Sequence, residues 1–416
     1  MVEACVFGPN YAVASKSMDV STAEGRRDFV RLLAYWSFSE DHRLGYDPTM
    51  RRLKELSCWE IEIPACSDNS EDSTAETGAE SQMPPTNVFY SNLMVTVSER
   101  LFGRHTRCFL ATPDKPLPGQ KLAADDYSVF VKDAWPEADE DSSKDARDEI
   151  RHLAKIKRIL GEKRPDLEGT YPTIKAGGRV LIGCSEGGGN AVQDTTRFIL
   201  GNVLEQSKAA EKRALETIAE DSEAEDAQTK RIVHVRVHKR IATTPIGQPI
   251  SKVKSVFELL VIIADVMKCH SAIYNECSVL HRDISINNIL FRRTPNGVAG
   301  LLIDFDHSKD EELDDGTTHD MRTGTLPFMS INNLENNNTK RTVLDDWESL
   351  IYILCWIGTY GYNSKTARKT MSSKPLKIRQ WVTDNMQVNA DNKRTALDSS
   401  KDFLQLVDEF NRDIPG

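Results

Sequence analysis

Residues 280–291 of this chain read Leu-His-Arg-Asp-Ile-Ser-Ile-Asn-Asn-Ile-Leu-Phe, and residues 302–306 read Leu-Ile-Asp-Phe-Asp. Between these two stretches, Thr-Pro-Asn-Gly at residues 294–297 separates two short, mainly apolar runs. Pro and Asn-Gly are strong turn signals, and short apolar runs on either side of a turn are typical of paired strands. The sequence therefore predicts a β-hairpin whose two ends are fixed against each other.

The predicted hairpin should bring Asp283, Asn288 and Asp304 to one pocket. Carboxylate and amide oxygens are ligands that divalent cations accept, and Mg²⁺ is commonly held by one or two carboxylates together with substrate phosphates. Phosphoryl transfer from a nucleotide needs such ligands and a carboxylate near the attacking hydroxyl. We therefore expect Asp283 to orient the hydroxyl of the acceptor. Asn288 and Asp304 would hold Mg²⁺ against the β- and γ-phosphates.

His-Arg-Asp at residues 281–283, with an asparagine five positions after the aspartate, resembles the catalytic loop of protein kinases, and Ile-Asp-Phe at residues 303–305 resembles their magnesium loop. Ile-Ser after His-Arg-Asp, and Asp-Phe-Asp in place of Asp-Phe-Gly, are similar to the fungal-type protein kinase family. The resemblance implies an α+β, bilobal, protein-kinase-like fold with a small β-rich N-lobe and a mainly helical C-lobe. It also implies ATP and Mg²⁺ as cofactors and proteins as substrates.

Three further residues match the nucleotide-binding part of this family pattern. The strand-like run at 127–132 ends in Lys132 and resembles the Val-Ala-Ile-Lys strand, which implies that Lys132 contacts the α- and β-phosphates. Glu149, in a helical run at 144–160, resembles the ion-pair partner of that lysine. The turn around Gly103 resembles the phosphate-covering loop but keeps this single glycine, so a simple hairpin turn is an alternative interpretation.

The chain beyond Asp304 resembles the acceptor side of a protein kinase. The acidic run at 309–318 is typical of an activation segment, and residues 322–329 resemble the substrate-docking turn. Within that turn, Thr325 is expected to hydrogen-bond near Asp283 and to shape the acceptor site. The Ala-Pro-Glu that usually ends the segment is here Ser-Ile-Asn, and Asn332 cannot form the salt bridge of a glutamate.

Three other positions acquire roles from the resemblance. Asp346 matches the aspartate that tethers the backbone of the catalytic loop, which is a structural role. Arg282 indicates control by phosphorylation of the activation segment, because an arginine at this position can pair with a phosphate. Ser285 stands where many Ser/Thr kinases carry a lysine that touches the γ-phosphate. The candidate phosphorylation sites are Thr317, Thr318 and Thr323.

Residues 255–277 predict a long amphipathic helix that forms the core of the C-lobe and leads to the catalytic loop. The face that we expect to be buried comprises Phe257, Leu260, Ile263, Met267, Ser271 and Tyr274. Alternating apolar residues predict a strand at 231–237. The hinge between the lobes, with an apolar slot for adenine, should follow within residues 238–249.

Composition along the chain predicts four parts. These are a helical N-terminal extension at 1–66, a disordered acidic and Ser-rich linker at 67–86, the N-lobe at 87–240 with insertions at 183–230, and the C-lobe at 241–416. In the extension, apolar residues recur at helical spacing between Phe29 and Trp36, and more weakly at Leu53, Leu56 and Trp59. The extension either packs on the next domain or regulates it.

Charge and cysteine usage restrict the partners and the compartment. The formal net charge of −10 argues against duplex nucleic acid as a main partner. The longest apolar runs are too short to span a bilayer, and the polar start predicts no secretory signal. Eight cysteines without a Cys-x-x-Cys pair suit reduced thiols in the cytoplasm or nucleus. Sequence alone leaves the oligomeric state open.

Three functions are compatible with these residues. The leading one is an ATP- and Mg²⁺-dependent protein kinase that acts on Ser or Thr. A kinase-shaped binding or scaffolding module is favoured by the single glycine of the phosphate turn, by Ser285 and by Asn332. Retention of Lys132, Asp283 and the magnesium ligands argues against that alternative. A small-molecule phosphotransferase is the third function, and Arg282 and the Gly-Thr turn at 324–325 argue against it.

Overall fold

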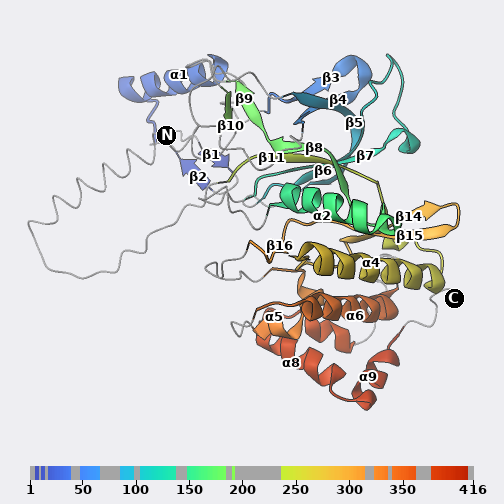
Figure 1. The fold of residues 1–416 in the computed structure, drawn as a ribbon. Coiled ribbons are helices and arrows are strands. Elements are labelled where there is room, and N and C mark those ends of the chain that lie inside the picture. Colours follow the sequence, from blue (N-terminus) through green and yellow to red (C-terminus); the bar gives the residue numbers. More distant parts are fainter. Residues whose placement is uncertain are drawn as a thin grey trace, which may run out of the picture. The chain divides into compact units, whose positions relative to one another are not determined.

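The computed structural model describes residues 5–8, 11–14, 17–38, 47–65, 85–97, 104–136, 148–183, 190–192, 236–313, 323–335, 340–361 and 376–410 (Figure 1). The chain divides into two compact units. The sheet unit comprises Met1–Ser142 and Lys175–Thr243, and the helical unit comprises Ser143–Ile174 and Thr244–Gly416. The fold is α+β, with a sheet-rich N-terminal part and helices in the C-terminal part, as the sequence predicts.

Seven strands form the main sheet of the sheet unit. They are β3 (Met50–Leu53), β4 (Cys58–Pro64), β5 (Thr86–Val97), β6 (Arg107–Thr112), β7 (Val129–Ala134), β8 (Thr173–Arg179) and β11 (Lys239–Thr244). Their order in space is β3-β4-β5-β6-β7-β11-β8, and the pairs from β3 to β11 are antiparallel. Alternate side chains of these strands share one apolar core, which includes Ile61, Phe109, Val131 and Ala242.

Residues 50–64 correct one prediction, because they form β3 and β4 rather than a continuation of the N-terminal helix. The weak helical spacing of Leu53, Leu56 and Trp59 was misleading. The stronger pattern is the alternation around Ile61 and Ile63, whose side chains are both fully buried. The predicted helix further upstream is confirmed as α1 (Ala23–Phe38). Two small hairpins complete the unit, β1 (Cys5–Gly8) with β2 (Tyr11–Ala14) and β9 (Leu181–Gly183) with β10 (Asn190–Val192).

The helical unit contains most of the helices. They are α2 (Glu149–Lys163), α4 (Val256–Cys277), α5 (Ile331–Glu335), α6 (Val343–Tyr360), α8 (Met386–Leu397) and α9 (Ser400–Val407). Its strands are β12 (Gln248–Pro249), β13 (Val279–Leu280), β14 (Ile289–Thr294), β15 (Gly297–Leu302) and β16 (Lys309–Asp310). The helix α2 packs against α4, which explains why residues 143–174 group with this unit rather than with the preceding sheet.

The helix α4 begins where the sequence predicts, but a different face of it is buried. Ser255 caps its N-terminus, with Oγ accepting from the amide of Glu258 at 3.2 Å. Of the expected face, Ile263 is buried, whereas Phe257 and Leu260 are 74% and 53% exposed. The buried face comprises Leu259, Ile262, Ile263, Val266, Cys269, His270, Ala272, Ile273 and Cys277. Because the helix is apolar almost all round, its periodicity could not select a face.

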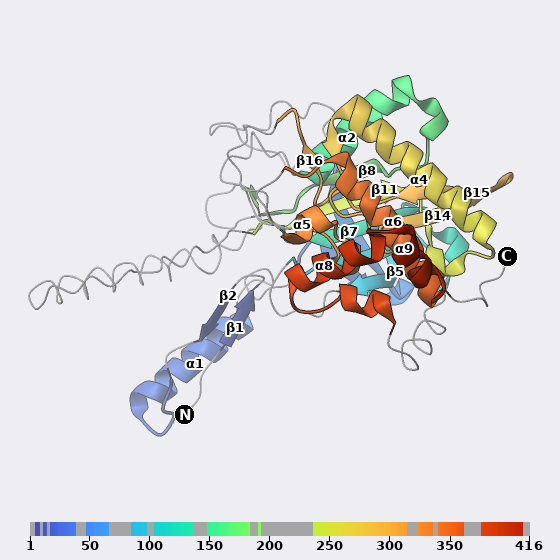
Figure 2. The same cartoon turned by 90° about the horizontal axis from the view of Figure 1, so that it is seen from below.

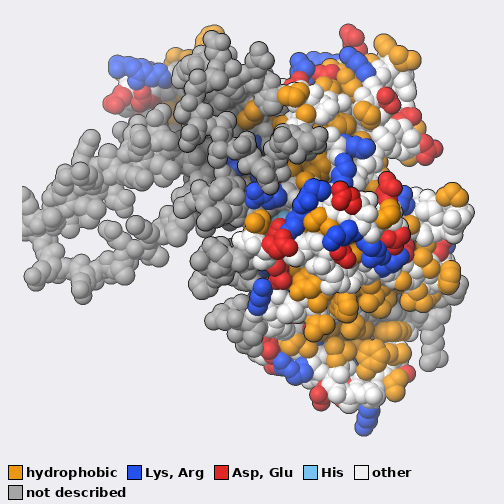
Figure 3. Space-filling view, in the orientation of Figure 1, with side chains coloured by type: hydrophobic (Ala, Val, Ile, Leu, Met, Phe, Trp, Pro, Cys, Tyr) orange, Lys and Arg blue, Asp and Glu red, His pale blue; other side chains and the backbone are white. Residues whose placement is uncertain are grey.

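Apolar side chains also remain exposed on α6, at Leu344 and Ile351. Figure 3 shows hydrophobic side chains, in orange, on the surface of the helical unit. Figure 1 shows α4 and α6 one above the other, and they contact each other directly.

The predicted β-hairpin is confirmed as β14 and β15, with Ile289 opposite Leu302 and Thr294 opposite Gly297. Figure 2 shows the hairpin beside α4, against which β15 packs. A side chain at Gly300 would not fit, because its Cβ would lie 2.5 Å from the carbonyl oxygen of Ile262. This close approach seats the hairpin on the helix and so positions the loops at its open end.

The strand β11 occupies Lys239–Thr244, which is part of the range given to the hinge. Residues 231–235, which make up most of the strand expected at 231–237, lie outside the described part.

Within the part that the structure describes, no helix is long and apolar enough to cross a membrane.

Candidate catalytic site

The loop between β13 and β14 places Asp283 and Asn288 in direct contact. The Asn288 side-chain amide donates to the backbone carbonyl of Asp283 at 2.8 Å and to its Oδ2 at 3.1 Å. The hydroxyl of Thr325, from the turn at 322–329, donates to Oδ1 of the same carboxylate at 3.0 Å. The two oxygens of Asp283 are therefore held by two different side chains, and the carboxylate has a fixed orientation.

Burial raises the pKa of Asp283, and the neighbouring charge of Asp304 raises it further. His307 and the hydrogen bonds from Thr325 and Asn288 act in the opposite direction, because they favour the charged form. The net shift is upward. Asp283 is thus a better proton acceptor than an exposed aspartate, while its two donors keep the carboxylate in place.

The backbone of the loop is held from below by Asp346 of α6. Both oxygens of this carboxylate accept from the amide of Arg282, at 3.1 and 3.0 Å, and Oδ2 also contacts Nε2 of His270 at 2.9 Å. Arg282 has a φ of +69°, a left-handed conformation that is costly for a residue other than glycine. Burial opposes the charge on Asp346, but His270 and Arg341 keep its pKa below the ordinary value. The buried carboxylate therefore stabilises a strained loop.

His281 joins the loop to the end of β15. Its Nε2 lies 3.1 Å from the carbonyl oxygen of Ile303, and its ring packs edge-on against Phe305 with the centroids 4.8 Å apart. Burial lowers the pKa of His281 to about 4, so the ring is neutral at physiological pH. A neutral ring that donates from Nε2 can accept the amide of Asp283 at Nδ1, where the distance is 3.3 Å.

The end of the hairpin gathers three carboxylates. Potential ligand atoms of Glu149, Asp304 and Asp306 all lie within 4.8 Å of one another. Asp304 has a φ of +68°, and the amide of the following Phe305 donates to Oε1 of Glu149 at 3.2 Å. An all-oxygen donor set of this kind fits a hard divalent cation such as Mg²⁺. Sequence reasoning did not assign Asp306, although the second aspartate of Asp-Phe-Asp was the signal that could have revealed it.

A family model for fungal protein kinases matches residues 1–358 of the chain. The chain belongs to the fungal protein kinase family. A search among curated proteins found no match. Membership in this family supports a kinase-type phosphotransferase activity and, with it, the use of ATP.

The kinase family pattern also includes Lys132, which the structure places on β7 of the sheet unit. Lys132 lies between Cys108 of β6 and Ile241 of β11, and only 9% of it is exposed. The Lys132–Glu149 ion pair stays a prediction, because the two residues belong to different units. Gly103 and the candidate phosphorylation sites Thr317 and Thr318 lie outside the described residues.

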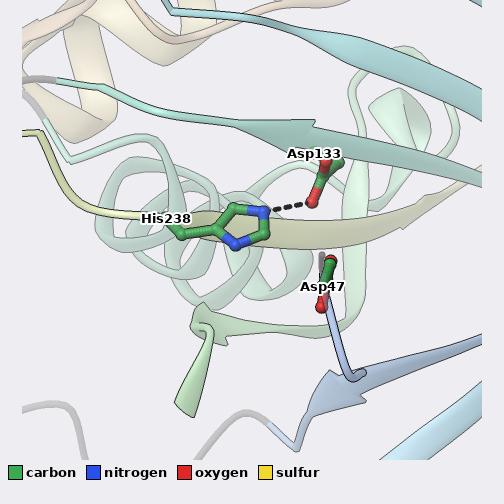
Figure 4. Close-up of side chains that lie close together, drawn as sticks. All are labelled: Asp47, Asp133 and His238. Carbon is green, nitrogen blue, oxygen red and sulfur yellow. Dashed lines mark hydrogen bonds and ion pairs between the residues drawn. The ribbon is translucent and has the colours of Figure 1, made fainter. Parts of the chain in front are cut away.

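The residue after Lys132 is the centre of a buried ion network on the opposite face of β7. Asp133 Oδ1 contacts Nε2 of His238 at 2.6 Å and accepts from Nε of Arg240 at 2.9 Å, and its Oδ2 accepts from Nε of Arg107 at 2.9 Å. Arg240 also bonds Asp47. Figure 4 shows Asp47, Asp133 and His238 gathered beside the sheet. Their spacing could suit a metal ion. The arginines already occupy the carboxylates, so we interpret the group as an ion-pair network.

Residues 330–332, which follow the docking turn, are attached to α6 by hydrogen bonds although position 332 is not a glutamate. Oδ1 of Asp345 accepts from the Ser330 hydroxyl at 2.7 Å and from the Asn332 side-chain amide at 3.2 Å. The amide of Ile331 donates to Oε1 of Glu348 at 2.8 Å. As expected, Asn332 forms no salt bridge, but its amide takes part in this tether to α6.

Arg282 and Ser285, the remaining residues singled out from the sequence, are both buried. The backbone carbonyl of Arg282 accepts from Nη2 of Arg341 at 2.8 Å, and Nη1 of Arg341 contacts the hydroxyl of Thr323 at 2.9 Å. Sequence reasoning did not identify Arg341, because nothing local to it indicates that it reaches the catalytic loop. The backbone carbonyl of Ser285 accepts from the amide of Asn288 at 3.0 Å within the loop.

Proposed function

We propose that this protein is an ATP- and Mg²⁺-dependent protein kinase that transfers the γ-phosphate to Ser or Thr hydroxyls of protein substrates. The observation that carries the proposal is the arrangement around Asp283. Its carboxylate is held between the Asn288 amide and the Thr325 hydroxyl, at 3.1 and 3.0 Å. Asp283 would accept or orient the proton of the acceptor hydroxyl, and correct position contributes more than strong basicity in this type of reaction.

The metal assignment rests on the oxygen donors at the end of the hairpin. Asn288 and Asp304 would hold Mg²⁺, and the nearby carboxylates of Glu149 and Asp306 add negative charge within 4.8 Å of Asp304. When bound, Mg²⁺ would neutralise charge on the phosphate oxygens. The left-handed backbone of Asp304, two residues after the end of β15, supports this assignment.

The nucleotide-binding residues complete the proposal from the family pattern. Lys132 would contact the α- and β-phosphates, with Glu149 as its partner, and the turn around Gly103 would cover the phosphates. Asp346 would keep its structural role beneath the loop, which its contacts with the Arg282 amide support.

The docking turn supports a protein as the acceptor. Thr325 connects this turn directly to Asp283, so the position of a bound polypeptide would be coupled to the position of the catalytic carboxylate. A small alcohol would need no such turn.

A kinase-shaped binding module remains the second candidate, and one observation favours it. Ser285 stands where a lysine would touch the γ-phosphate, and its hydroxyl, on a residue that is only 1% exposed, supplies no cation there.

The test is phosphate transfer from Mg-ATP to the protein itself, to a generic protein acceptor and to small alcohols or amines. We expect transfer to protein, and we expect Asp304→Asn to lower it by a factor of about 100 or more, because a metal ligand is lost. Asp384→Asn, a change at an exposed carboxylate of the helical unit, should leave it unchanged. Folded wild-type protein that transfers nothing would support the binding module. Transfer to small molecules alone would support the small-molecule phosphotransferase.

A further inference from the structure

The docking turn is held at its N-terminal end by side-chain donors. The backbone carbonyl of Thr323 accepts from Nδ2 of Asn333 at 2.7 Å and from Nη1 of Arg341 at 3.1 Å. Arg341 is 6% exposed and also bonds the catalytic loop at the carbonyl of Arg282. This end of the turn is therefore tied to the loop that carries Asp283.

A second buried cation holds the C-terminal end. Nζ of Lys393, on α8, donates to the backbone carbonyl of Met329 at 2.6 Å. Lys393 is completely buried, and its Nζ lies 4.0 Å from the ring centroid of Tyr352 and 5.7 Å from that of Trp381. Met329 itself packs in an apolar cluster with Leu334 and Ala390. The amine thus sits at the junction of the turn with α6 and α8.

No carboxylate of the described residues forms a salt bridge with Lys393. Glu348 of α6 is an acidic group that raises the pKa of Lys393, and its carboxylate already accepts from the Ile331 amide and the Tyr352 hydroxyl. On its own helix, Arg394 pairs with Glu335 of α5 and with Asp391. A buried amine without a counter-ion is costly, and the carbonyl oxygen and the two aromatic faces compensate only in part. An apolar side chain of similar length would avoid that cost, which points to a role other than packing.

We propose that Lys393 is a positioning residue that fixes the C-terminal end of the docking turn and thereby sets the affinity for the protein acceptor. The inference rests on the proposed function and adds a residue outside the family match of 1–358. Thr325, midway along the turn, contacts Asp283 at 3.0 Å, so movement at Met329 is transmitted toward the catalytic carboxylate. Asn332 is uncharged and cannot fix this end of the turn by an ion pair. The hydrogen bond from Lys393 to the carbonyl oxygen of Met329 holds it instead.

The charge on Lys393 gives this tether a pH dependence. Burial lowers the pKa of Lys393 to about 7, against the opposing effect of Glu348. The ammonium therefore loses its proton as the pH rises through about 7, and this loss weakens a charge-assisted hydrogen bond to the carbonyl oxygen of Met329. The unfolded chain binds more protons than the folded chain above that pH. This group's contribution to the free energy of unfolding therefore rises with pH, while the turn loosens.

The experiment compares the wild-type chain with Lys393→Met, Lys393→Arg and, as a matched control, Lys401→Met at an exposed lysine of α9. Acceptor KM, Mg-ATP KM and amide hydrogen exchange of residues 323–335 are measured at about pH 6 and about pH 8.5, on either side of the Lys393 pKa. Exchange rates are corrected for their intrinsic pH dependence.

We expect Lys393→Met to raise the acceptor KM and the exchange rate of the turn about tenfold at the lower pH, the size of one charge-assisted hydrogen bond. The KM for Mg-ATP should stay within about twofold. In the wild type, acceptor KM and turn exchange should rise with pH. Lys393→Arg, which keeps its charge throughout, should retain acceptor affinity and lose that pH dependence. This variant also supplies the test if Lys393→Met fails to fold.

Three results would overturn the proposal. The first is an acceptor KM and a turn exchange rate in Lys393→Met that equal those of the wild type. The second is faster exchange throughout the helical unit with both KM values raised together, which would indicate a merely structural role. The third is a wild-type chain that transfers no phosphate. This third result would overturn the proposed function and the acceptor-affinity role together, whereas hydrogen exchange would still show whether Lys393 holds the turn.

Discussion

Asp133 in the sheet unit and Asp346 in the helical unit are both completely buried, and both have a lowered pKa, yet they stabilise different kinds of structure. Asp133 bonds the side chains of Arg107 on β6, Arg240 on β11 and His238, which directly precedes β11. Asp346 bonds the backbone amide of Arg282, a residue with a φ of +69° in a loop. The strands beside Asp133 already have their own hydrogen-bond ladder, whereas the loop above Asp346 has none.

This difference indicates that the two buried charges have different roles, one in overall stability and one in holding the catalytic loop. Arg107 and Arg240 both depend on Asp133 for charge neutralisation, so the charge of Asp133 supports global stability. Asp346 contacts His270 and lies near Arg341, and the guanidinium of Arg341 also donates to the carbonyl oxygens of Arg282 and Thr323. Loss of the Asp346 charge should therefore cost less stability and more activity. The same substitution at both positions tests this comparison.

The largest effect on stability is expected for Asp133→Asn. The amide keeps the shape of the carboxylate but, among the described residues, leaves the completely buried Arg240 with Asp47 as its one charged partner. We expect the free energy of unfolding to fall by about 3–5 kcal/mol, as for other broken buried ion pairs. Urea unfolding measures it. A loss below about 1 kcal/mol would show that the network is not electrostatically important.

Asp346→Asn should lower the free energy of unfolding by a smaller amount, about 1–3 kcal/mol, because hydrogen bonds to a buried charge are replaced by weaker ones. We expect phosphate transfer to fall by more than about tenfold at a temperature where the variant is fully folded, since the Arg282 amide loses its tether. If the ratio of activity loss to stability loss were the same in the Asp133 and Asp346 variants, the two carboxylates would not differ in role as proposed.

A smaller effect is expected for Thr325→Val, which removes one hydrogen bond from Asp283. Burial already holds the pKa of Asp283 above the ordinary value, and Thr325 opposes that shift. Without Thr325 the pKa rises further. Because the carboxylate is the active form, the acid limb of kcat/KM should move to higher pH. The pH–rate profiles of both proteins measure this, and an unmoved or downward-shifted limb would show that Asp283 is not the group that titrates.

The smallest effect is expected for Arg51→Ala, which serves as the reference for the sheet. Arg51 pairs with Glu60 and Glu62 on the same sheet as Asp133, but its side chain is 61% exposed. Exposed pairs of this type contribute about 0–1 kcal/mol. Urea unfolding should therefore show little change. A loss as large as that of Asp133→Asn would mean that burial does not distinguish the two.

The parts of the molecule that could be predicted from sequence are those whose signal is local. The hairpin followed from Pro and Asn-Gly between two short runs, and the bounds of α4 followed from the amphipathic pattern of residues 255–277. The expected contact between Thr325 and Asp283 followed from the family motif, and the structure contains that hydrogen bond. The roles of these residues in catalysis stay predictions.

What could not be predicted depends on partners distant in the chain or on two competing patterns. Residues 50–64 carried both a weak helical spacing and a strand alternation, and the sheet decided between them. The helix α4 was apolar on several faces, so only packing against β15 and other elements selected the buried one. Asp133, Arg341 and Lys393 each bond residues far away in sequence, and no local pattern announces such contacts.

The most direct measurement is single-turnover phosphate transfer from Mg-ATP to a protein acceptor by the wild-type chain and by Asp283→Asn, with nucleotide affinity measured in parallel. The asparagine keeps the size of the side chain but cannot accept the proton. We expect transfer to fall by a factor of about 100 or more, while the affinity for Mg-ATP changes by less than about threefold. Equal transfer by the two proteins would contradict the assignment of Asp283 as the residue that orients the acceptor.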